Sequence, residues 1–100
     1  MTASIGIWAR GDATGEQVLY RWEADQVSGF VTFEVAARRF RPADGNGRPI
    51  GDLLFDAGTG DANGTAAGVD RRLFSQVVGA ILRGYARAGQ ATATAHAHYY

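Results

Sequence analysis

The sequence predicts an α+β fold in which an antiparallel sheet of four or five strands is covered on one face by a single long helix, in the order β-β-β-β-α-β. Three observations predict it. The first half of the chain alternates apolar and polar residues with the period of two typical of half-buried strands. Clusters of Gly, Asp and Asn separate these stretches and mark turns. Near the C-terminus, residues 69–88 carry apolar side chains at helical spacing.

The first two strands are predicted to form a hairpin. Residues 4–10 place Ile5 and Ile7 on one side of the first arm, and residues 11–15 supply a turn rich in residues that tolerate positive φ. Residues 17–24 form the second arm. Its apolar side carries Val18, Tyr20 and Trp22.

Residues 30–40 are interpreted as one long third strand with a uniformly apolar face that packs on the core. Pro42 follows a group of arginines and, because it lacks an N–H, is expected to end the strand. Residues 44–47, Asp-Gly-Asn-Gly, are the strongest turn signal in the chain, and residues 49–57 are the predicted fourth strand. The core-facing side chains of the third strand are Val31, Phe33, Val35 and Ala37.

The predicted helix spans residues 69–88. Asp70 lies at its start, where the helix dipole favours an acid, and Gly89 is the expected C-cap. Gly79 and Gly84 each lower the stability of a helix relative to alanine. Their expected use is to allow the helix to pack closely on the sheet, since glycine has no side chain.

Two segments flank this helix. Residues 58–68 contain no large apolar side chain and are predicted to be a long loop. Residues 91–100 alternate again and predict a final strand, whose partner in the sheet the sequence leaves open. With no linker or internal repeat, residues 1–100 are predicted to form a single domain.

The composition excludes several kinds of site. The chain has no cysteine, so disulfides, thiolate nucleophiles and cysteine-based zinc sites are excluded. Ten arginines balance ten acidic residues, so no net charge draws the protein to nucleic acid or to an anionic membrane. No segment has the pattern of a signal peptide or the length of a membrane span, and we expect a cytoplasmic protein with no membrane association.

A glycine-rich segment is the most suggestive motif. Residues 53–60 resemble the strand and glycine loop that hold a phosphate group in methyltransferases and sugar kinases. Those folds need several βαβ units, and only one helix follows here. As a calcium loop starting at Asp61, the sequence has Ala66 where glycine is required and Arg72 where a glutamate belongs. We therefore predict no cofactor at this segment.

Two histidines near the C-terminus could share a metal ion. His96 and His98 lie two apart on a predicted strand, so both rings would lie on one face. No third ligand is marked by its spacing, and exposed histidines at a fraying strand end are the favoured explanation of the pair. We predict no metal site and no catalytic residues.

Aromatic and arginine side chains are instead the candidates for an interaction surface, because both are enriched where proteins bind one another. The candidates are Trp8, Tyr20, Trp22, Arg38, Arg39, Arg41, Arg72, Arg83 and Arg87.

Two resemblances bear on function. Residues 4–11 (Ser-Ile-Gly-Ile-Trp-Ala-Arg-Gly) and 17–22 (Gln-Val-Leu-Tyr-Arg-Trp) resemble the start of a group of small uncharacterised bacterial proteins, over about the first quarter of the chain. The length and the sheet-plus-helix layout are similar to immunity proteins of polymorphic toxins. The second resemblance implies a small inhibitor that binds a larger protein, and neither implies catalytic residues.

The sequence thus favours a non-enzymatic protein-interaction module, either an immunity-type inhibitor or an accessory protein that docks a larger partner. Its open sheet edges also allow a homodimer. One alternative is a small enzyme or ligand-binding protein that uses residues 56–68. A second is RNA binding by aromatic residues on the exposed face of the sheet, which the balanced charge disfavours.

Overall fold

Alternating apolar residues form the centre of an antiparallel sheet. The computed structural model describes residues 3–99, with side chains for residues 4–97. Strands β1 (Ala3–Ala9), β2 (Gln17–Ala24) and β3 (Val27–Glu34) pair in sequence. One side of these strands is almost fully buried, as the period of two requires. The buried side chains include Ile5, Ile7, Val18, Tyr20, Trp22, Val31 and Phe33.

The predicted third strand is wrong in length, because residues 30–40 form two arms of a hairpin. The chain reverses between β3 and β4 (Arg39–Ala43), with Arg38 in the left-handed region at φ 54°. No glycine or proline marks this turn in the sequence. Phe33 and Phe40 become cross-strand partners whose rings stack with centroids 4.3 Å apart. Burial of this aromatic pair favours the reversal over a continuous strand.

Pro42 was expected to end the strand, and this prediction is wrong, because Pro42 lies inside β4. It pairs with Val31 inside β4, and its carbonyl accepts a hydrogen bond from the Ile50 N–H. The N–H and C=O of one strand residue point the same way, so the donor that proline lacks would face away from β3. The ladder between β3 and β4 therefore loses nothing.

The predicted fourth strand pairs with β4 in two separate places. Pro49 bridges Ala43, and β5 (Leu54–Asp56) pairs with Arg39 and Phe40. Residues 51–53 bulge between these contacts, where the N–H groups of Asp52 and Leu53 both donate to the Thr65 carbonyl. The bulge carries Leu53 into the core.

Residues 58–68 are not the structureless loop that was predicted. They contain β6 (Asp61–Asn63), which pairs antiparallel with β5 and forms one edge of the sheet. The sheet therefore has seven strands in the order β6-β5-β4-β3-β2-β1-β7, rather than four or five. The class, an antiparallel sheet with one helix packed on it, is as predicted.

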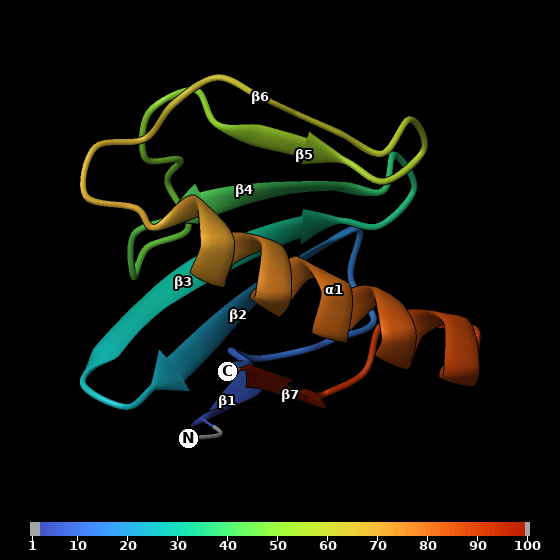
Figure 1. Cartoon of the computed structure of the whole chain (residues 1–100). Helices are drawn as coiled ribbons and strands as arrows, with labels where there is room; N and C mark the ends of the chain where they lie inside the picture. The colour runs from blue at the N-terminus through green and yellow to red at the C-terminus, as the bar shows by residue number, and fades with distance from the viewer. Residues whose placement is uncertain (1–2, 100) are drawn as a thin grey trace.

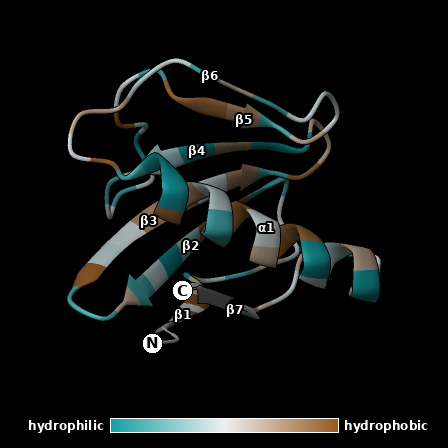
Figure 2. Ribbon diagram, viewed as in Figure 1, coloured by the Kyte–Doolittle hydropathy of each residue, from teal (hydrophilic) through white to brown (hydrophobic). Residues whose placement is uncertain are grey.

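Helix α1 (Arg71–Ala88) begins two residues later than predicted, because Asp70 is its N-cap. The Asp70 side chain accepts hydrogen bonds from the N–H groups of Arg72 and Leu73. Gly89, at φ 74°, ends the helix as predicted. Figure 1 shows α1 crossing one face of the sheet, and Figure 2 shows hydrophobic and hydrophilic residues alternating along it. The residues buried against the sheet are Phe74, Val77, Val78, Ala80 and Ile81.

The final strand, β7 (Thr94–Tyr99), pairs with β1 at the opposite edge from β6. A hydrogen bond from the hydroxyl of Tyr20, in β2, to the Thr92 carbonyl (2.7 Å) joins the core to the segment between α1 and β7. Burial raises the pKa of the Tyr20 hydroxyl. This bond fixes how the C-terminal segment returns to the sheet.

Replacing Tyr20 with phenylalanine should lower the free energy of unfolding by about 1 kcal/mol near neutral pH, since the Thr92 carbonyl loses its donor. A raised pKa in the folded state means that the neutral phenol stabilises the fold below about pH 10, and that this stability is lost as the pH rises further. We therefore expect the wild type, but not Tyr20→Phe, to lose this contribution in urea titrations above about pH 10. Equal alkaline losses in both proteins would contradict this role.

Candidate interaction surface

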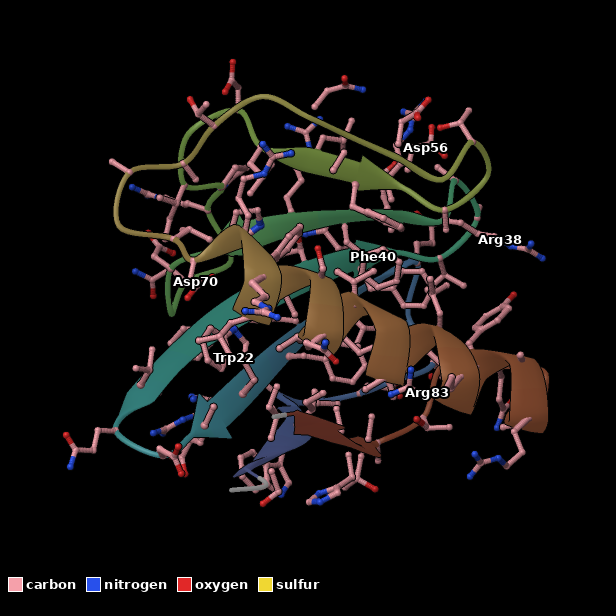
Figure 3. The ribbon with its side chains drawn as sticks, in the orientation of Figure 1. Trp22, Arg38, Phe40, Asp56, Asp70 and Arg83 are labelled. Carbon is pink, nitrogen blue, oxygen red and sulfur yellow. The ribbon has the colours of Figure 1, made fainter. Side chains whose placement is uncertain are left out.

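The three predicted aromatic residues do not share one surface. Tyr20 and Trp22 belong to the buried side of β2, with exposed fractions of 0% and 8%, so they are core residues. Figure 3 shows Trp22 and Phe40 between α1 and the sheet. Trp8 lies on the other face, which no helix of residues 3–99 covers, and is 44% exposed. The register explains the difference, since Trp8 pairs with Arg21 and Trp22 with Ile7.

The exposed Trp8 ring is held in place by a neighbouring glycine. A Cβ atom on Gly6 would lie 2.7 Å from Trp8 Cη2, so the indole lies over Gly6 on its own strand. Trp22 packs in the same way on the opposite face, where a Cβ on Gly29 would be 2.8 Å from its ring. Trp8 is thus an aromatic ring that is both exposed and restrained.

Side chains around Trp8 extend an apolar and basic area across β1, β2, β3 and β4. Leu19 and Phe30 are half-buried there, and the Arg10 guanidinium carbon lies 5.8 Å from the centre of the Phe30 ring. Arg21 forms an ion pair with Glu23 (2.6 Å). We call this area the open-face patch: Trp8, Arg10, Leu19, Arg21, Phe30 and Arg41.

Four residues of the patch were not among the candidates predicted from the sequence: Arg10, Leu19, Arg21 and Phe30. The alternation of side chains along the strands could have identified them, because the strand register places each on the same face of the sheet as Trp8. The pairing of β1 with β2 and of β2 with β3 was needed to place them side by side.

The predicted arginines are distributed over three parts of the molecule. Arg39 and Arg41 lie on the open face, where Arg39 Nε is 3.7 Å from Asp56 Oδ2. Arg38 projects from the turn between β3 and β4, with its guanidinium carbon 5.7 Å from the centre of the Tyr85 ring. The remaining three, Arg72, Arg83 and Arg87, are exposed on α1. They cannot all contact one partner surface.

The glycine-rich segment is a hairpin between β5 and β6. Asp56 accepts a hydrogen bond from the Gly58 N–H at its side chain (2.9 Å) and from the Gly60 N–H at its carbonyl (2.8 Å). Gly64 (φ +86°) lies so close to the Asp52 carbonyl that no side chain would fit. These groups close turns in the chain itself, so they are not arranged as a phosphate-binding loop.

Titratable groups with shifted pKa values also have structural causes. The Thr14 hydroxyl, followed by the Thr14 N–H, lowers the pKa of Asp12, and the N–H groups of Arg48 and Asn46 lower the pKa of Asp44. Both carboxylates are exposed turn residues. Each carboxylate is hydrogen-bonded within its own turn, Asp12 to the hydroxyl and N–H of Thr14 and Asp44 to the N–H groups of Asn46 and Arg48.

His96 is exposed on β7, while the side chain of His98 lies outside the described residues, so the pair stays untested as metal ligands. Among the side chains of residues 4–97, no three His, Asp or Glu residues gather closely enough to hold a metal ion. Comparisons with known proteins find no matching family model, no matching curated protein and no matching solved structure. Within the described part of the chain, α1 is too polar to cross a membrane.

We predict that the two tryptophans differ in access to solvent. Acrylamide should quench about half of the tryptophan fluorescence readily, because Trp8 is exposed and Trp22 is buried. Trp8→Phe should remove the readily quenched fraction and Trp22→Phe the protected one. Equal quenching in the two variants would contradict the assignment of the two faces.

A glycine comparison tests whether the β5 to β6 hairpin needs its glycines for folding. Gly60→Ala should cost about 1 to 2 kcal/mol of stability, because Gly60 has positive φ but open space around it. Gly64→Ala should cost at least about 1 kcal/mol more, since the new methyl group would also collide with Asp52. Urea denaturation measures both, and equal losses would contradict the packing at Gly64.

Proposed function

We propose that the protein is an interaction module that docks a larger protein partner through the open-face patch. The restrained, exposed indole of Trp8 carries this proposal. A ring already held in one position loses little conformational freedom on binding, and tryptophan and arginine are the residues that contribute most at protein interfaces. The patch combines both residue types. Arg10 lies over the ring of Phe30, and Arg41 lies on β4, the strand that pairs with the one carrying Phe30.

The charges on the open face favour a protein over RNA. Acidic side chains alternate with the arginines on this face: Glu23 pairs with Arg21, and Asp56 lies beside Arg39. Glu34, also exposed, is opposite Arg39. A phosphate backbone would be repelled by these carboxylates, whereas a protein surface can offer both signs of charge.

The narrower form of the proposal is an immunity-type inhibitor or an accessory protein. The support is the small size and the sheet-plus-helix layout, which resemble those of immunity proteins at the level of the sequence. A ligand-binding role for residues 56–68 has less support, because Asp56 and the glycine N–H groups of that hairpin are engaged in turns.

Affinity purification from the native cell tests the proposal. We expect a partner protein that is retained by the wild type, retained by Val27→Ala and lost with Trp8→Ala. Val27 is a suitable control because it is also apolar and 49% exposed but lies on the other face of the sheet. Removal of a central interface tryptophan typically lowers affinity by about 2 kcal/mol or more.

A subtler variant keeps the indole but displaces it. Gly6→Ala should displace the Trp8 ring from its position over β1. The affinity for the same partner should then fall although no contact group has been removed. Loss of binding with Val27→Ala but not with Trp8→Ala would overturn the proposal, as would tight binding of homopolymeric RNA that weakens steeply with salt.

A further inference from the structure

Acidic and basic side chains are unevenly distributed along the chain. Residues 71–100, whose described part includes α1 and β7, contain four arginines and no aspartate or glutamate, so all ten acidic residues precede them. Because β7 lies at the edge of the sheet and α1 contacts it, this edge of the molecule is basic although the whole chain is neutral.

A groove of about 230 Å³ runs between α1 and β7. Ala80, Gly84 and Ala88 of the helix leave it open, and Gly84 approaches closely enough that a Cβ atom there would be 3.0 Å from Thr92 Oγ1. The close packing expected at Gly84 therefore occurs against the segment that leads into β7. Arg83 and Arg87, one helical turn apart, line the same groove.

The two arginines are available to a ligand. Neither forms an ion pair with any side chain that the structure describes. A Cβ on Gly79 would lie 3.3 Å from Arg83 Nη1. The Arg83 guanidinium therefore lies against the helix at Gly79, where there is no side chain. Figure 3 shows Arg83 on the side of α1 that is near β7.

The outer edge of β7 can accept another strand. The Ala9 N–H donates to the Ala93 carbonyl (2.8 Å), so in an antiparallel ladder Ala93, Ala95 and Ala97 direct their peptide groups to β1. Thr94 directs its own N–H and C=O to the outer edge, where the carbonyl also accepts a hydrogen bond from the Thr92 hydroxyl (2.8 Å). The described residues of this edge include none of the lysines, prolines or bulges with which proteins usually block strand addition.

We propose that the α1–β7 groove binds an extended acidic segment of a partner protein. The segment adds to β7 as an eighth strand, and side chains on one of its faces place their carboxylates against Arg83 and Arg87. Arginine binds carboxylates in a bidentate way, which fixes the register of the added strand. The groove adjoins the open-face patch, because Thr94 is the cross-strand partner of Trp8, so variants of Arg83 and Arg87 on α1 distinguish this proposal from the first one.

Charge selects this occupant over a second copy of the chain. Two copies joined through β7 would bring four groove arginines together with no carboxylate from residues 71–100 to balance them. An acidic strand instead supplies the missing charge and the backbone partners together.

A synthetic peptide of alternating threonine and glutamate serves as the probe, with fluorescence anisotropy as the measurement. We expect the double variant Arg83→Gln/Arg87→Gln to weaken binding by about tenfold for each arginine removed. Arg72→Gln is the matched control, because Arg72 is equally exposed but lies at the far end of α1 from the groove, and it should leave binding unchanged. Replacing glutamate by glutamine in the peptide should have the effect of the double variant.

Thr94→Pro tests strand addition itself. It removes an N–H on the outer edge without touching the ladder to β1, so it should abolish peptide binding while thermal unfolding stays cooperative. Three results would overturn the proposal: equal weakening by Arg72→Gln, inorganic phosphate that competes with the peptide while Thr94→Pro has no effect, or a wild-type dimer that Thr94→Pro converts to a monomer.

Discussion

One helix can cover only one face of a sheet, and this constraint determines most of the molecule. Side chains alternate along each strand, so packing of α1 on one face places most residues of one parity in the core of the central strands and leaves the other parity on the open face. Tyr20 and Trp22 thereby become core residues, and Trp8, on the opposite parity, becomes an exposed one. The open face is the direct consequence of having a single helix among the described residues.

Short polar residues are used largely to close the chain's own turns. The carboxylates of Asp12, Asp44, Asp56 and Asp70 each accept backbone N–H groups close by in sequence. Residue types that suggest a ligand site in the sequence are therefore already hydrogen-bonded once the chain folds. Exposed arginine and aromatic side chains, in contrast, are the residue types on which the proposed recognition depends.

The two proposed surfaces differ in the physics of recognition. On the open face, positive and negative side chains alternate around an aromatic centre, which suits a folded partner with a complementary pattern. In the groove between α1 and β7 the charged side chains are the two arginines, and they lie beside an edge strand, which suits an extended acidic segment. The two surfaces meet at Thr94, which pairs with Trp8 and also lines the groove.

The sequence alone determined the parity of β1, β2 and β3, the helix with its Gly89 cap and the α+β class, because these depend on local periodicity and backbone preference. It missed the turn at Arg38, the bulge at residues 51–53 and strand β6, because none of them has a local signal as strong as the tertiary packing that stabilises it. Only the tertiary structure decided which residues share a surface. Arg10 meets the ring of Phe30, and Arg83 lines a groove with residues of β7, through pairings between segments distant in the chain.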